Sequence, residues 1–133
     1  MFDKKILWGS STNAQQFEGG YDLGGKGLTI ADVRNIDMDT ITDSNFDSFK
    51  IASDHYHHME EDIAYYGEMG MQIYRFTMAW ARIFPNGDDA VPNQEGLDFY
   101  DRMLTELEKY NITPVCTLYA YDLPLALLEK YEG

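Results

Sequence analysis

The stretch QIYRFTMAWARIFPNG, residues 72–87, determines how the rest of the chain is interpreted. It opens with an apolar and aromatic run that contains one charged residue, Arg75, a pattern that predicts a buried strand. Because an unpaired buried charge is costly, Arg75 is expected to be buried and held by a partner. The partner is either a nearby carboxylate in a structural ion pair or a catalytic carboxylate that the rigid guanidinium orients.

Amphipathic helices are predicted on both sides of this strand. The helix before it is expected to begin after Asp54, which can cap it, and to end near Gly67 and Gly70. The helix after it is expected to open at residues 92–93 and to stop at Asn111. The apolar positions that recur at helical spacing are Tyr56, Met59, Ile63 and Tyr66 in the first helix and Leu97, Tyr100, Met103, Leu104 and Leu107 in the second.

Two further strands and one helix complete the predicted pattern. The strands are expected at residues 6–11 and 112–118, and a short last helix at residues 125–130, with Asp122 available to cap it. Strands that alternate with amphipathic helices predict an α/β fold with a parallel sheet and right-handed crossovers.

The loops that follow parallel strands carry the ligand chemistry in such folds, because they meet at one edge of the sheet. Three segments are therefore expected to lie together: residues 16–18, 75–80 and 119–122. Gln16 and Glu18 offer the polar contacts that grip sugar hydroxyls, although loop residues of this kind are as often simply solvated.

Composition limits the classes of function. The 133 residues are enough for one domain, and 23 acidic against 10 basic residues give a formal net charge of −13, which argues against nucleic acid or an anionic membrane as a partner. The single Cys116 fits a reducing compartment. With no apolar run of signal-peptide or membrane-span length, a cytoplasmic location is expected.

Two groups of residues suggest binding sites and have simpler interpretations. The glycines between residues 19 and 27 do not have the spacing of a phosphate-binding fingerprint, so a flexible surface loop is favoured over a phosphate cradle. His55, His57 and His58, with Asp62, are favoured as helix-face residues over a metal site, because no third zinc ligand is evident. Neither a metal nor a cofactor is expected.

No carboxyl pair in the sequence can be assigned to catalysis. Retaining glycoside hydrolysis needs two carboxyl groups about 5–5.5 Å apart. Glu18 and Asp122 lie in suitable loops, yet each has a simpler use in a turn or a cap.

Beyond these local patterns, five segments resemble family 1 glycoside hydrolases, the retaining β-glucosidases and 6-phospho-β-glucosidases. They are LWGSSTNAQQFEGG (7–20), GGKGLTIADV (24–33), DHYHHMEEDIAYYGEMGMQIYRFTMAWARIFPNG (54–87), PNQEGLDFYDRMLTELEKYNITPVCTL (92–118) and DLPLALLEKYEG (122–133). The second is similar to the version in the 6-phospho branch. The resemblance thus extends over essentially the whole chain.

The resemblance implies a (β/α)8 barrel, a fold of about 250 residues. Residues 1–133 would then form a single N-terminal portion, a partial TIM barrel with the first three βα units and parallel strands. Gln16 matches the glutamine that binds the sugar, Tyr121 matches an aromatic residue beside it, and Arg75 matches the arginine that contacts the catalytic nucleophile. Ala120 departs from the family pattern, because a histidine is expected there.

The resemblance also implies what this chain would not do. The family's acid/base and nucleophilic glutamates lie in Asn-Glu-Pro and Glu-Asn-Gly motifs, and the sequence contains neither. We therefore expect a truncated relative of enzymes that hydrolyse β-glucosides or 6-phospho-β-glucosides, itself inactive and without catalytic residues of its own.

Two alternatives of other classes remain open at this point. Three strands cut from a barrel expose unpaired edges, which favours a self-associating or partner-completed structural protein. The other alternative is a small sugar-binding module without turnover, which would use Gln16 and the aromatic residues near Trp80 and Tyr121.

Overall fold

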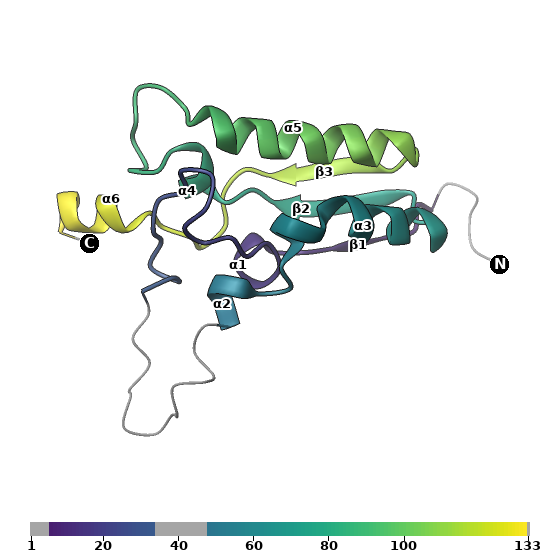
Figure 1. The fold of residues 1–133 in the computed structure, drawn as a ribbon, viewed down its shortest axis with the longest axis horizontal. Coiled ribbons are helices and arrows are strands. Elements are labelled where there is room, and N and C mark those ends of the chain that lie inside the picture. The colour runs from purple at the N-terminus through teal and green to yellow at the C-terminus, as the bar shows by residue number, and fades with distance from the viewer. Residues whose placement is uncertain (1–5, 34–47, 133) are drawn as a thin grey trace, which may run out of the picture.

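The computed structural model describes residues 6–33 and 48–132 (Figure 1). Its centre is a three-stranded parallel sheet in the order β1 (Gly9–Ser11), β2 (Ile73–Thr77) and β3 (Thr113–Thr117). Ile73 is the register partner of Gly9 on one side and of Thr113 on the other. The predicted α/β fold with parallel strands is confirmed. The polar stretch 37–47 lies outside the described residues.

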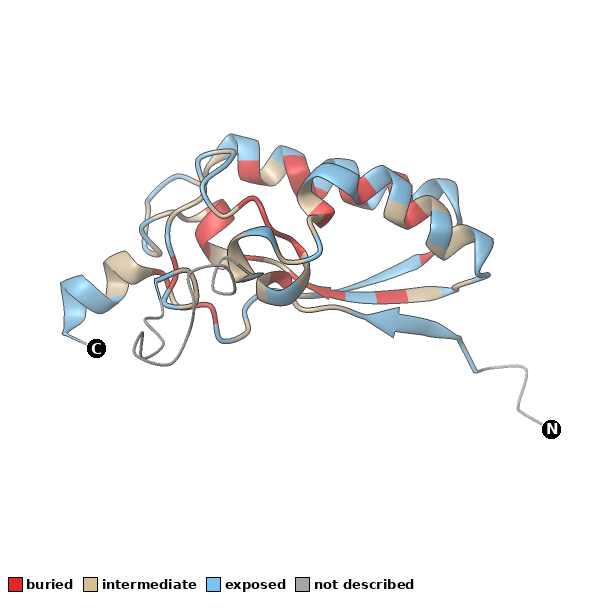
Figure 2. Ribbon diagram, turned by 60° about the horizontal axis from the view of Figure 1, so that its bottom comes forward, coloured by how far each residue is buried: buried red, intermediate tan, exposed pale blue. Residues whose placement is uncertain are grey.

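Two long helices, α3 (His55–Glu68) and α5 (Gln94–Lys109), pack on one face of the sheet (Figures 1 and 2). Both match the predicted helices. The last helix, α6 (Leu125–Tyr131), also lies where the sequence predicts it. Three short helices lie in segments that were expected to be loops or strand ends: α1 (Ala14–Phe17), α2 (Ser48–Ile51) and α4 (Trp80–Ile83).

The core lies between the two long helices and β2. Its buried members are Met59 and Ile63 of α3, Tyr74 and Phe76 of β2, and Phe99, Tyr100, Met103 and Leu107 of α5, together with Ile83 and Ile112. The predicted apolar stripes supply five of these ten residues and three partly buried neighbours, and Leu104, at 40% exposed, is the stripe member that does not contribute. Burial of this apolar surface stabilises the described part of the fold.

The opposite face of the sheet is uncovered in the described part of the chain, and this corrects the prediction for Arg75. In β2 Tyr74 and Phe76 point into the core, so Arg75 lies on the other face and is exposed. β1 is exposed along its length, and Val115 in β3 is 42% exposed. The first strand is also shorter than the predicted 6–11, and it is not buried.

Both predicted side-chain caps are wrong. Asp54 occupies the N-cap position of α3, but its backbone is left-handed with φ 55° and its carboxylate binds His57 Nδ1 at 2.6 Å instead of a helix N–H. Asp122 does not cap α6, where Pro124 is the N-cap residue. No helix within residues 6–33 and 48–132 is both long enough and apolar enough to cross a membrane.

Candidate functional site

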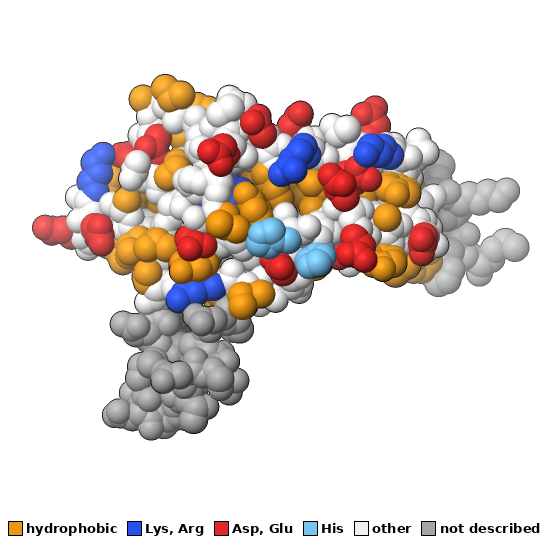
Figure 3. Space-filling view, viewed as in Figure 1, with side chains coloured by type: hydrophobic (Ala, Val, Ile, Leu, Met, Phe, Trp, Pro, Cys, Tyr) orange, Lys and Arg blue, Asp and Glu red, His pale blue; other side chains and the backbone are white. Residues whose placement is uncertain are grey.

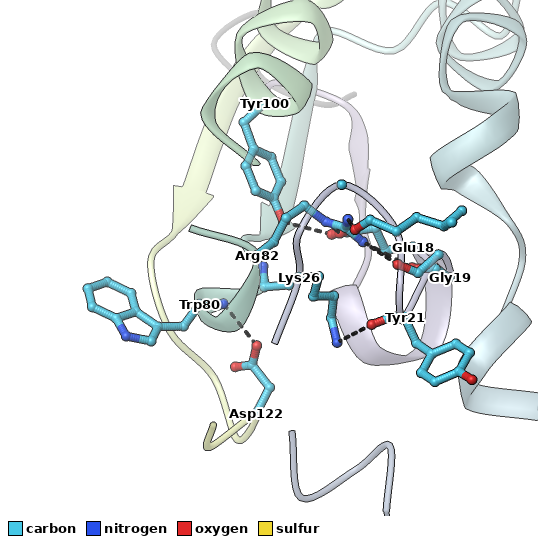
Figure 4. Close-up of polar contacts among 12 residues, drawn as sticks. Glu18, Gly19, Tyr21, Lys26, Trp80, Arg82, Tyr100 and Asp122 are labelled. Carbon is cyan, nitrogen blue, oxygen red and sulfur yellow. Dashed lines mark hydrogen bonds and ion pairs between the residues drawn. The ribbon is translucent and has the colours of Figure 1, made fainter. Parts of the chain in front are cut away.

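The loops after the three strands meet at the carboxyl edge of the sheet (Figure 4). The Trp80 N–H, after β2, donates to Asp122 Oδ2, after β3, over 3.0 Å. Gln15 Nε2 of α1, after β1, donates to the Ala120 carbonyl over 3.5 Å. These contacts fix the loops relative to one another, so side chains from all three can act on one ligand.

Arg75 stands on the open face of the sheet and is held by hydroxyl groups. Its Nε donates to Thr117 Oγ1 on β3 over 3.0 Å, and its Nη1 donates to Ser11 Oγ on β1 over 3.3 Å. In the described part of the chain no carboxylate pairs with it, so the predicted structural ion pair is wrong. Two neutral partners orient the guanidinium without neutralising it, and its other N–H groups can receive an anion.

Gln16 and Tyr121 are also exposed at this edge. Gln16 lies on α1, and Tyr121, at 82% exposed, lies in the loop after β3 with φ 66°. Within residues 6–33 and 48–132 no hydrogen bond joins Gln16, Arg75 and Tyr121. Gln16 and Tyr121 follow the two outer strands, and Arg75 lies within the strand between them.

The buried arginine of the segment is Arg82, which the sequence analysis did not single out. It lies in α4 with 0% exposure, and its Nε forms an ion pair with Glu18 Oε1. The guanidinium lies between the rings of Tyr56 and Phe99, 4.5 and 5.2 Å from their centroids. The sequence held two signals for this pair: a second arginine between the apolar residues Ala81 and Ile83, and an acidic residue, Glu18, in the first loop.

The glycine loop is ordered around Arg82, which corrects the prediction of a flexible surface loop. Arg82 Nη2 donates to the carbonyls of Gly19 and Gly20 over 3.1 and 3.2 Å, and Nη1 donates to Leu23 O over 3.2 Å. Gly19 and Gly20 have φ of 70° and 54°, where a side chain would be strained. The inward-facing carbonyl oxygens of the loop therefore bind the Arg82 guanidinium.

Glu18 is fully engaged in this buried network. Its second oxygen, Oε2, accepts from Tyr100 Oη over 2.7 Å, and the same Tyr100 oxygen accepts from the Ala79 N–H over 2.7 Å. Burial raises the pKa of Tyr100 well above its usual value, and the Glu18 carboxylate adds to the shift. Burial acts to lower the pKa of Arg82, but the facing Glu18 carboxylate leaves it raised, so the guanidinium stays charged. Glu18 is therefore a structural carboxylate.

Asp122 is the other buried carboxyl at this edge. Its Oδ2 receives the Trp80 N–H at the start of α4, while Oδ1 has no partner in the described part of the chain. Burial raises the pKa of Asp122 to about 6, although the backbone N–H groups that it accepts from act in the opposite direction. Its role in the structure is to join the loop after β3 to α4.

The histidines do not form a metal centre. His55, the first residue of α3, is buried, and its Nδ1 lies 2.6 Å from Asp62 Oδ2. His57 and His58 are exposed beside Asp54 and Glu61. No group of three or more His, Cys, Asp or Glu residues in the described segments is arranged to hold a metal ion.

Acidic side chains are spread over the face shown in Figure 3.

Comparison with known sequences gives one consistent family. Residues 1–133 match the model described as "Glycosyl hydrolase family 1". The chain is 48% identical over 136 residues to a 6-phospho-beta-glucosidase from Clostridium longisporum and 47% identical over 136 residues to a phospho-cellobiase from Klebsiella oxytoca. These alignments cover 99% of the chain but only 28% and 29% of the two relatives.

Comparison with solved structures agrees with this. A rice beta-glucosidase superposes with a TM-score of 0.88 at 42% identity, covering 99% of this chain and 27% of that one. A family 1 beta-glucosidase from Thermotoga maritima superposes with a TM-score of 0.85 at 38% identity, covering 98% of this chain and 29% of that one. The three parallel strands thus correspond to part of the barrel in these enzymes.

Substituting the two arginines of the 72–87 stretch separately should give opposite results. Arg82→Ala leaves Glu18 buried without its cation, and we expect a loss of about 3–5 kcal/mol in the free energy of unfolding. Arg75→Ala removes an exposed side chain and should change that free energy by no more than about 0.5 kcal/mol. Urea unfolding followed by circular dichroism measures both, and equal losses would contradict the assignment of Arg82 as the buried arginine.

Asp122 should make stability depend on pH. Its folded pKa of about 6 lies above the unfolded value of about 3.9, so the stability that it contributes is present below pH ~4 and lost as pH rises through 6. Asp122→Asn should remove this part of the pH profile. Asp88 supplies a control of opposite sign. A hydrogen bond from Lys130 lowers the pKa of Asp88, so Asp88→Asn should remove stability that the wild type loses on acidification. A wild-type minus Asp122→Asn difference that stays constant between pH 4 and 7 would refute the prediction.

Proposed function

We propose, since this chain belongs to glycosyl hydrolase family 1, that it supplies the sugar-binding edge of the first three βα units of a β-glucosidase of that family. The observation that carries the proposal is the state of Arg75. It is charged, exposed, and oriented by Thr117 and Ser11 on the face of the sheet that the helices leave open. That geometry suits an arginine that receives a carboxylate from elsewhere in a barrel.

The residues at the edge would make different contacts with the sugar. Gln16 has a donor and an acceptor for sugar hydroxyls, and the exposed ring of Tyr121 offers an apolar surface for a sugar face. Ala120 has no polar side-chain atom, so the histidine contact that the family resemblance implies would be missing. We infer a binding edge weaker than that of a relative with histidine at this position.

The chain by itself would not carry out hydrolysis. A retaining mechanism requires one carboxyl group to attack the sugar and another to protonate the leaving group, about 5–5.5 Å apart. At this edge Glu18 is bound by Arg82 and Tyr100, and Asp122 is bound to the Trp80 N–H. Both carboxyl groups have structural roles, so the residues described here bind and position.

For the substrate we propose a 6-phospho-β-glucoside. Similarity to a 6-phospho-beta-glucosidase and to a phospho-cellobiase, together with GGKGLTIADV at residues 24–33, supports the phosphorylated sugar. Relatives that act on unphosphorylated substrates are also similar, among them a beta-glucosidase A from Acetivibrio thermocellus at 44% identity. We place the activity in the cytoplasm, which the single, exposed and unpaired Cys116 fits.

Hydrolysis assays test this proposal directly. The purified 133-residue chain should give no turnover of chromogenic β-glucoside or chromogenic 6-phospho-β-glucoside above an Arg75→Ala sample prepared identically. Turnover in the chain that the substitution abolishes would contradict a purely binding and positioning role. Equal traces in both samples would indicate a contaminating enzyme.

A second candidate, a partner-completed or self-associating protein, is favoured by the exposed sheet. β3 is an edge strand with exposed residues along most of its length, and Val115 and Leu118 are apolar and exposed. Charge opposes association of identical copies, because each carries a net charge of −13.

Solution mass separates these alternatives. If edge pairing operates, light scattering should give a mass above 15.3 kDa that rises with ionic strength, because salt screens the repulsion. Val115→Lys on β3 should return the sample to a monomer, while Leu104→Lys on the helical side should not. A strict monomer at every salt concentration would exclude self-association.

A further inference from the structure

A small cavity beneath α1 contains two buried polar atoms that have no partner in the described part of the chain. They are Nε2 of His55 and Oγ1 of Thr77, and both residues are less than a twentieth exposed. Both line the same cavity, together with Thr12, Glu18, Tyr74 and Tyr100. Buried polar atoms in folded proteins are nearly always hydrogen-bonded, to protein or to an internal water.

We propose that this cavity is the binding site of a single structural water molecule that bridges His55 Nε2 and Thr77 Oγ1. The cavity has room of about 10 Å³, which is the lower limit for one water. His55 Nε2 and Thr77 Oγ1 would give the water the minimum of two hydrogen bonds, and the other polar side chains that line the cavity offer more. The inference does not depend on the proposed function.

The hydrogen-bonding roles follow from Asp62. Its Oδ2 lies 2.6 Å from His55 Nδ1, and an ionised carboxylate can only accept, so Nδ1 carries the proton. Nε2 is the ring nitrogen left without a protein partner in the described residues, and a water can either donate to it or accept from it. The water hydrogen-bonds to Nε2 and accepts a hydrogen bond from the Thr77 hydroxyl group, which satisfies both unpartnered atoms.

The site joins elements that are distant in the sequence. Asp62 and His55 belong to α3, Thr77 is the last residue of β2, and the ring of Phe17 in α1 lies 4.6 Å from the His55 ring. The side chain of Asp62 is 27% exposed, so the hydrogen-bonded path Asp62–His55–water–Thr77 runs from solvent to the end of the central strand. A bound water at this point would fix the base of the helix that carries Gln16.

High-resolution crystal structures of three proteins test the site. The wild-type chain should show an electron-density peak within about 2.7–3.2 Å of both His55 Nε2 and Thr77 Oγ1. Thr77→Val keeps the side-chain shape without the hydroxyl and should lose the peak. Thr77→Ser keeps the hydroxyl and should retain it, so this variant decides the matter if the valine variant does not fold.

Solution NMR of the His55 ring nitrogens supplies an independent readout. Nδ1 should be protonated, because it faces the Asp62 carboxylate, and Thr77→Val should move the Nε2 resonance further than Thr77→Ser. Absence of the density peak in the wild type, a direct His55–Thr77 contact, or an Nε2 resonance that neither substitution moves would each overturn the proposal.

Discussion

The buried ion pair between Arg82 and Glu18 is the constraint on which the rest of the edge depends. Removing two charges from water is costly, and the attraction between them compensates only when geometry is good and the remaining donors and acceptors are satisfied. Here the guanidinium also binds three backbone carbonyls, and Glu18 also accepts from Tyr100. The first loop, α4 and α5 therefore meet at one cluster, and the loop backbone is shaped by the cation at its centre.

The two faces of the sheet differ in their chemistry. On the covered side, aromatic and aliphatic residues from α3, β2 and α5 form the core. On the other side, Arg75 donates to the hydroxyl groups of Thr117 and Ser11. The strands β1 and β3 are largely exposed (Figure 2). One arginine of the 72–87 stretch thus stabilises the fold, and the other remains charged and free to meet an acidic group. Arg75 and Arg82 lie seven positions apart in the sequence, yet one is exposed and the other is fully buried.

Much of the fold could be predicted from the sequence, because periodicity records which side of each element is apolar. The long helices and the alternation of strands and helices follow from that signal. Periodicity does not show which charged residue is buried, because burial depends on which face of the sheet the helices cover. Arg75 and Arg82 are equally plausible buried residues until α3 and α5 are placed. The four-residue helices α1 and α4 are too short to show a period, and the partner of Asp122 is 42 residues away in sequence.

Most of the core comes from one continuous stretch of chain, which affects how the protein can fold during translation. α3, β2 and α5 follow one another between residues 55 and 109, and the contacts that bury Tyr74, Phe99 and Leu107 all lie within the described residues. Contacts between neighbouring elements form quickly, and domains fold as units while the chain emerges. In any longer polypeptide that begins with this segment, the helix-covered half can be complete on the ribosome before later strands are translated. The open side of β3 would then act as a template that receives the next strand.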